Sequence, residues 1–93
     1  LAAIARSNGK TALHSAARNG HVHVVKALLS KEPGIAPRND KKGQTALHMA
    51  VKGQHLAVVE ELIKGDPSLI NMVDNKGNTA LHIATRKGRA QVK

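Results

Sequence analysis

Three histidines recur at a fixed interval, and histidine is a side chain that can hold a metal ion or move a proton. His14, His48 and His82 stand 34 residues apart. Zinc needs ligands about 2 Å from the metal, whereas equivalent side chains on neighbouring packed helices lie roughly 10 Å apart. His21 and His23 form a second candidate pair, but residues two apart on a helix face different ways. We therefore interpret the three spaced histidines as structural and predict no metal site.

The rest of the sequence lacks the arrangements typical of an active site. No serine lies in a G-x-S-x-G context, and the glycines recur singly rather than as a phosphate-binding loop. The six acidic residues are scattered, and there is no cysteine to act as a nucleophile or thiolate ligand. We predict that this segment is not an enzyme and binds no cofactor.

The histidines belong to a segment that is written three times. The copies are GKTALHSAARNGH from Gly9, GQTALHMAVKGQH from Gly43 and GNTALHIATRKGR from Gly77. Threonine is a good N-cap residue, and the histidine follows three residues later, where a capping box places Glu or Gln. Each histidine is therefore expected to bond the cap and neighbouring loop backbone. The predicted capping residues are Thr11, His14, Thr45, His48, Thr79 and His82.

Each copy predicts two short helices. Leu13, Ala16 and Ala17 fall at i, i+3 and i+4, which makes one face of the first helix apolar. Gly20 then supplies the left-handed backbone that ends a helix, and HVHVVKALL predicts a second one. The stretches between copies contain Pro and Gly and close with DKKG or DNKG, which indicates loops ending in turns.

The period predicts the fold class. Units of 20 to 50 residues that cannot bury their own apolar face stack into a solenoid. We expect a single all-α domain, residues 1–93, of helix-turn-helix units joined by hairpin-like loops, with repeats at about 6–39, 40–73 and an incomplete 74–93. Because the third repeat is incomplete, we expect a fragment of marginal stability. Its exposed apolar end, with Leu81, Ile83 and Ala84, would also favour self-association.

The T-A-L-H-x-A core in a 34-residue period resembles ankyrin repeats from about residue 9 to residue 91. Within that superfamily, DKKGQTALHMAVKGQ and DPSLINMVDNKGNTALHIATRKGR resemble the plant ankyrin-repeat membrane proteins that carry a C-terminal PGG domain. The resemblance implies a cytoplasmic protein–protein interaction module in a stress or defence signalling protein. Later membrane helices would anchor that parent protein, with the module at the cytosolic face of the plasma membrane. The N-terminus, LAAIARSN, has no basic leader, so we do not expect a secretory signal.

Two copies depart from the repeated pattern. Arg6 stands where the later copies have the aspartate that opens the turn. Gln54 stands where Gly20 and Gly88 end the first helix in the other copies, and Gly53 lies one residue earlier. We expect the turn in the middle repeat to differ or to be strained.

The charge of the chain is strongly basic. Fifteen Lys and Arg against six Asp and Glu give a net charge of +9, which favours acidic partners. In ankyrin repeats the hairpin tips and the exposed side of the first helix line a concave binding face. Carried onto this sequence, the expected partner-binding residues are Lys10, Arg18, Asn19, Lys41, Lys42, Gln44, Lys52, Asn75, Lys76, Asn78, Arg86 and Lys87, with the apolar Met49 and Ile83 beside them.

Three functions compete for this surface. We hypothesise a groove for an acidic protein segment, which should be sensitive to changes at Met49 and Ile83. An anionic membrane surface should respond only to total charge, and a purely structural spacer should respond to neither. Nucleic-acid binding is disfavoured because the chain has no aromatic residue for base stacking and no recognition-helix motif.

Overall fold

The computed structural model describes the backbone of residues 11–92 and the side chains of residues 11–86. Within that part of the chain there are five α-helices and two short 3₁₀ helices, and no strand. The helices are α1 (Ala12–Asn19), α2 (Val22–Lys31), α3 (Ala46–Lys52), α4 (Leu56–Gly65) and α5 (Ala80–Val92). The all-α prediction is confirmed.

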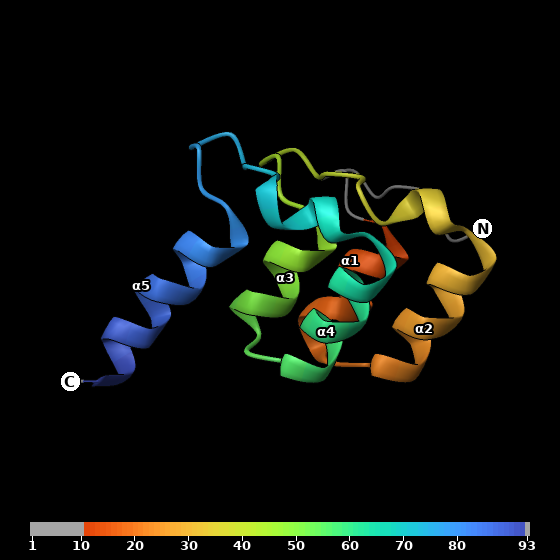
Figure 1. The fold of residues 1–93 in the computed structure, drawn as a ribbon, viewed down its shortest axis with the longest axis horizontal. Coiled ribbons are helices and arrows are strands. Elements are labelled where there is room, and N and C mark those ends of the chain that lie inside the picture. Colours follow the sequence, from red (N-terminus) through yellow and green to blue (C-terminus); the bar gives the residue numbers. More distant parts are fainter. Residues whose placement is uncertain (1–10, 93) are drawn as a thin grey trace.

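The helices stack as two rows, which Figure 1 shows with the connecting turns along the upper edge. The first helices of the copies pack in the order α1, α3, α5, and the second helices α2 and α4 pack against each other. Each second helix also packs against the first helix of its own copy. The result is an elongated body of 41 × 25 × 21 Å, the helical repeat solenoid that the period predicts.

The helix starts carry reciprocal caps with histidine in the place of Glu or Gln. The backbone N–H of His14 donates to Thr11 Oγ1 over 3.4 Å, and the Thr11 N–H donates back to His14 Nδ1 over 3.1 Å. Thr45 and His48 form the same capping box at the start of α3. The left-handed turn that ends α1 lies at Gly20, with φ of 76°, so both ends of this helix follow from the sequence.

The core is aliphatic and runs between the two rows of helices. Leu13, Leu47 and Leu62 are at most 1% exposed. Two further core residues come from the 3₁₀ helices, η1 (Pro33–Ile35) and η2 (Pro67–Asn71), which the sequence predicted only as loop. Each 3₁₀ helix turns one apolar side chain inward, and Ile35 and Leu69 are 2% and 0% exposed. These loops are therefore part of the packed interior.

The turn of the middle repeat is strained, as its sequence predicted. Gln54 takes the left-handed conformation with φ of 60°, at the position that Gly20 occupies in the first repeat. That conformation costs a residue with a Cβ about 1–2 kcal/mol. Gly53 has an ordinary φ of −81°, but a Cβ there would lie 2.5 Å from the backbone oxygen of Arg18. The glycine is needed for the close approach of two turns, and Gln54 bears the strain.

The third copy differs from the expected helix, turn and helix. α5 continues without a break through Gly88 to Val92, so the predicted turn at Gly88 is wrong. In the first two copies a second helix packs back on the first and holds the left-handed residue in place. No second helix follows α5 within the described residues, and the helical hydrogen bonds continue past Gly88.

The apolar end of the stack agrees only in part with expectation. Leu81 is 68% exposed, and Ala84 is also exposed. Ile83, in contrast, is 6% exposed, so its predicted exposure is wrong. Ile83 lies on the side of α5 that faces α3, whereas Leu81 lies where a further helix would pack. Leu56, at the start of α4, is 70% exposed.

Candidate functional site: a basic groove along the first helices

Two tight turns build one wall of the site. Asp40 Oδ1 accepts hydrogen bonds from the backbone N–H groups of Lys42 and Gln44, each over 2.9 Å. The turn closes with a bond of 2.9 Å from the Gly43 N–H to the Asp40 carbonyl. Asp74 accepts the two equivalent bonds in the next turn, also over 2.9 Å. The repeated aspartate thus fixes the backbone on which the basic side chains stand.

The two turns are joined to each other through Asn75. Its backbone N–H donates to the Lys42 carbonyl over 2.9 Å, and its side-chain Nδ2 donates to the Lys41 carbonyl over 2.7 Å. A Cβ at Gly43 would lie 2.6 Å from Asn75 Oδ1, so glycine is required there for this contact as well as for its φ of 76°. The Asn75 amide, predicted to meet a partner, is used to connect neighbouring repeats.

The histidines of the first two copies connect the same edge of the stack. His14 Nε2 lies 2.8 Å from the Gln44 carbonyl, and His48 Nε2 lies 2.9 Å from the Asn78 carbonyl. A carbonyl oxygen can only accept, so Nε2 carries the proton, and Nδ1 accepts from the threonine N–H. Each ring is therefore the neutral tautomer with both nitrogens engaged. This is the structural role that the sequence suggested.

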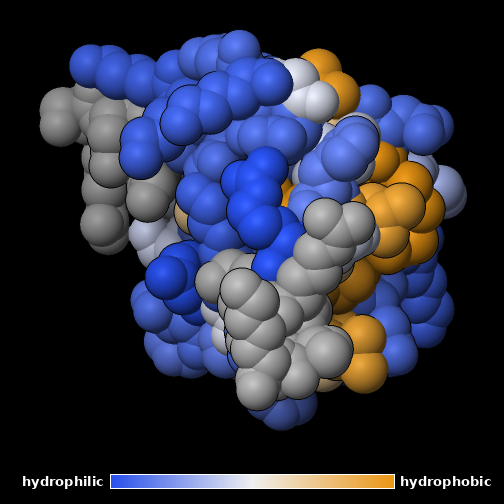
Figure 2. Space-filling view, turned by 90° about the vertical axis from the view of Figure 1, so that its left-hand side faces the viewer, coloured by the Kyte–Doolittle hydropathy of each residue, from blue (hydrophilic) through white to orange (hydrophobic). Residues whose placement is uncertain are grey.

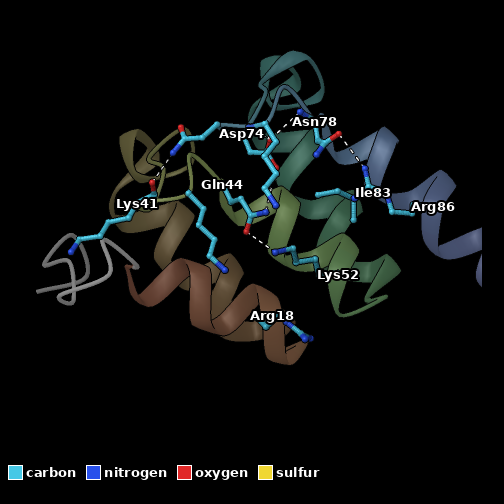
Figure 3. Close-up of a pocket in the computed structure, with 11 residues that line it drawn as sticks. Arg18, Lys41, Gln44, Lys52, Asp74, Asn78, Ile83 and Arg86 are labelled. Atoms are coloured by element: carbon cyan, nitrogen blue, oxygen red, sulfur yellow. Dashed lines mark hydrogen bonds between the residues drawn. The ribbon is translucent and has the colours of Figure 1, made fainter.

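Below the turns lies an open groove of about 600 Å³. Figure 3 shows that its side chains come from the turns and from three successive helices, with Arg18 on α1, Lys52 on α3 and Arg86 on α5. The lining residues are Arg18, Lys41, Lys42, Gln44, Lys52, Asp74, Asn75, Lys76, Asn78, Ile83 and Arg86. Six of the eleven are cationic and one is acidic, so the groove is a positively charged surface.

Most of the residues predicted to bind a partner come together in this groove, with four exceptions. Lys10 and Lys87 lie outside the residues whose side chains the structure describes. Asn19 is exposed at the end of α1 but does not line the groove. Met49 is 2% exposed and belongs to the core. The prediction that Met49 lies beside the basic residues is wrong, because α3 is packed on both sides, by α1 and by α5.

Asp74 is the groove residue that sequence reasoning missed. Gln44 Nε2 donates to Asp74 Oδ2 over 3.4 Å, while Gln44 Oε1 accepts from Lys52 Nζ over 2.7 Å. The carboxylate is thus linked to a groove cation through one buried amide. In the sequence, Asp74 is recognisable only as a turn residue, 34 residues after Asp40. Its role in the groove depends on the contact of its second carboxylate oxygen with Gln44 of the preceding repeat, which the spacing does not reveal.

The pKa of Asp74 reflects this position. Burial raises the pKa of the carboxyl, but the hydrogen bonds from the backbone N–H groups of Asn78 and Lys76 lower it. The hydrogen bond from Gln44 lowers it further, and the pKa of Asp74 lies below its ordinary value. Asp74 is therefore ionised at neutral pH, and its carboxylate already accepts the hydrogen bonds that hold the turn.

The acidic residues lie mainly on the other side of the molecule. Of the six in the chain, only Asp74 lines the groove. On the second row of helices, Glu61 of α4 lies 3.6 Å from Lys26 of α2. Asp66 caps η2 by accepting from the Ser68 N–H over 3.1 Å. The positive charge of the groove is therefore offset by only one acidic residue among those that line it.

The exposed end of the stack carries an apolar pocket. Figure 2 looks onto this end and shows hydrophobic surface gathered on the right of the view, beside a hydrophilic left-hand part. The pocket measures about 240 Å³ and is lined by Leu47, Val51, Val59, Ile63, Ile70, Ala80, Leu81 and Ala84. These residues come from α3, α4, η2 and α5, so the pocket lies where a further second helix would pack.

Neither a metal-binding cluster nor a helix able to span a membrane is found in the described part of the chain. Across residues 11–86, no three His, Asp or Glu side chains come close enough together to hold a metal ion. None of the helices that the structure describes combines the length and the apolar character needed to cross a bilayer.

The family follows from this architecture and from the sequence together. A family model described as ankyrin repeats (3 copies) matches residues 2–71 and, in a second overlapping match, residues 34–93. The chain therefore belongs to the ankyrin repeat family, whose domains are generally non-catalytic modules that bind other proteins. No curated protein is similar enough to this chain to count as a match.

Proposed function

We propose that this chain is a protein-binding module whose basic groove holds an acidic segment of a partner protein. The observation that carries the proposal is the lining of the groove, with six cations and a single carboxylate that is engaged in a turn. Binding an anionic segment would relieve the mutual repulsion of these cations. Charge complementarity of this kind speeds association and weakens with salt.

A comparison of two charge-reversed variants tests the proposal. The groove variant carries Lys42→Glu and Lys76→Glu, and the control carries Lys31→Glu and Lys64→Glu outside the groove. All four lysines are exposed, and both variants change the net charge by the same amount. Binding of fluorescein-labelled acidic peptides would be measured by fluorescence anisotropy at two salt concentrations, with circular dichroism to show that each variant folds.

The outcomes separate the competing functions. We expect the control to keep most of the affinity and the groove variant to lose about tenfold or more, which corresponds to about 1.4 kcal/mol. Equal losses in both variants would mean that only total charge matters, and sedimentation with phosphatidylserine vesicles would then test a lipid surface. Absence of peptide binding by the unaltered protein would reject the proposal.

The setting of the module is part of the same proposal. The resemblance of the middle copy, the third copy and the loop between them to plant ankyrin-repeat membrane proteins with a PGG domain supports a place at the cytosolic face of the plasma membrane. In that setting the module would recruit an acidic partner during stress or defence signalling. Fluorescence microscopy of the tagged parent protein in plant cells tests this part, and a uniformly cytosolic or nuclear signal would argue against it.

We also propose that two copies of the chain associate through the apolar end. The pocket of about 240 Å³ and the 68% exposure of Leu81 support this proposal, because apolar surface gains free energy when it leaves water. Sedimentation velocity over a range of concentrations tests it. A wild-type chain that stays monomeric throughout, or a Leu81→Glu variant that associates equally well, would contradict self-association at this end.

A further inference from the structure

The groove cations stand in register with the repeats. Arg18, Lys52 and Arg86 are 34 residues apart and come from α1, α3 and α5. Figure 3 shows them along one side of the groove, and the three helices pack in that order. We call these three residues the helix row. Packed helices lie about 8–10 Å apart, and this distance sets the expected spacing between neighbouring cations of the row.

Two of these cations are held by an amide of their own copy. Lys52 Nζ donates to Gln44 Oε1 over 2.7 Å, and an Arg86 Nη donates to Asn78 Oδ1 over 3.3 Å. Gln44 and Asn78 are also equivalent residues, and each precedes its cation by eight positions. The same local bond therefore directs Lys52 and Arg86 toward the turns. The charged ends of these side chains are consequently expected to have the same spacing as the helices that carry them.

A second set of cations runs parallel to the helix row along the turns. Lys42 and Lys76 occupy equivalent positions 34 residues apart. Their backbone N–H groups are fixed by the aspartates that open the turns, and Asn75 joins the two turns directly. A ligand in the groove would thus lie between two rows of positive charge with a common spacing.

Among regular peptide conformations, the polyproline II helix fits this spacing best. It has three residues per turn and rises 3.1 Å per residue, so residues i and i+3 point the same way about 9 Å apart. A β-strand places residues i and i+3 on opposite faces. An α-helix brings residues i and i+7 about 10 Å apart on one face, but it is 10–12 Å wide with its side chains. Three acidic residues at this spacing would need about fifteen residues of α-helix, against about seven of polyproline II.

We infer that the groove selects an extended, polyproline II segment with an acidic residue at every third position. This inference rests on the proposed function and specifies its ligand. Each carboxylate of the segment meets one cation of the helix row, and the backbone runs beneath the turns. Ile83, which is 6% exposed, supplies a small apolar contact on the floor of the groove. Because the chain has no aromatic residue, the charge register carries the selectivity.

Peptides of equal composition test the inference. Each would contain seven residues with three Glu in a proline-rich background. One peptide places Glu at positions 1, 4 and 7, a second places them side by side, and a third places them at 1, 3 and 5. Dissociation constants would be measured by anisotropy with the intact chain. We expect the peptide with spacing three to bind about tenfold more tightly than the other two.

Protein variants show whether the helix row is the cause. Lys52→Gln removes the middle cation, and Lys31→Gln removes an exposed lysine outside the groove with the same change in net charge. We expect Lys52→Gln to reduce the preference for spacing three to less than threefold, while Lys31→Gln retains it. Arg86→Gln, at the exposed end of the stack, serves as a second row variant if Lys52→Gln impairs folding.

The outcomes distinguish the inference from the function on which it rests. Equal binding of the three peptides would overturn the register inference and leave the acidic-segment proposal standing. A preference for spacing three that survives in both row variants would also overturn it. Failure of all three peptides to bind would count against both, since each carries the acidic charge that the groove requires.

Discussion

The middle and last copies of the repeated segment have similar amino-acid sequences but different surroundings. Leu47 of the middle copy is 1% exposed, whereas Leu81, its equivalent in the last copy, is 68% exposed. His48 is fully buried, and His82 is exposed. The middle copy has a neighbour on both sides and the last copy on one. The comparison teaches that in this stack the energetic value of a motif residue depends on the next copy as much as on its own.

The largest difference is expected between the two leucines. Leu47→Ala should lower the free energy of unfolding by about 2–5 kcal/mol, because it leaves a cavity between packed helices. Leu81→Ala should change it by less than about 0.5 kcal/mol, since the side chain is on the surface. Urea denaturation followed by circular dichroism measures both. Similar losses in the two variants would show that a second copy covers Leu81 in solution.

A smaller difference is expected between the two histidines. His48→Ala removes the bond to the Asn78 carbonyl and leaves the Thr45 N–H buried without its acceptor. Such unpaired groups cost about 1–3 kcal/mol. His82 bonds Thr79 at an exposed helix start, and His82→Ala should cost under about 1 kcal/mol. The same urea denaturation experiment measures the loss of stability in both variants. Equal losses would mean that the hydrogen bond from His48 to the Asn78 carbonyl adds no stability beyond that of the helix cap.

The two turns that end α1 and α3 offer a third comparison. Gln54→Gly should stabilise the protein by about 0.5–1 kcal/mol, because relief of the left-handed strain exceeds the entropy cost of glycine. Gly20→Gln should destabilise it, since a Cβ at Gly20 would lie 2.6 Å from the His55 ring. Thermal melts of both variants test this pair. A Gln54→Gly variant with a lower melting temperature would mean that the glutamine side chain makes a compensating contact.

The smallest effect is expected from the groove carboxylate. The pKa of Asp74 is lowered in the folded chain, so its ionised form stabilises the fold above the ordinary pKa of about 4. This contribution is lost as the pH falls from about 4 through the lowered value. Asp74→Asn should therefore lose less stability than the wild type between pH 7 and pH 3. Parallel curves of stability against pH for the two proteins would show that Asp74 does not contribute to the pH dependence of stability.

The sequence predicts the parts of this fold that are local. The caps at Thr11 and Thr45, the left-handed turn at Gly20 and the aspartate turns at Asp40 and Asp74 each depend on a few adjacent residues, and the structure contains them all. The gathering of basic side chains also follows from the period, because equivalent positions of stacked units share a face. Whether that face binds a partner stays a prediction.

The features that the sequence did not predict depend on contacts between repeats. Met49 was predicted to lie beside the basic residues from its position in the repeat, but it is 2% exposed and packs in the core between the copies. Asn75 was predicted to meet a partner, but it joins the two neighbouring turns. Asp74 was predicted only as a turn residue, but it also accepts a hydrogen bond from Gln44 of the preceding repeat. The unbroken α5 was not predicted either, because Gly88 does not end the helix.

The hydrogen bonds between repeats give the stack an uneven stiffness. His14, His48 and Asn75 all tie one copy to the next at the turn edge, where bond lengths and angles are tightly limited. The helix bodies meet through aliphatic side chains, whose contacts have no preferred direction. We therefore expect the distance between neighbouring copies to vary less at the turns than at the helix bodies. The cations on the turns should accordingly keep a more constant separation than the helices do.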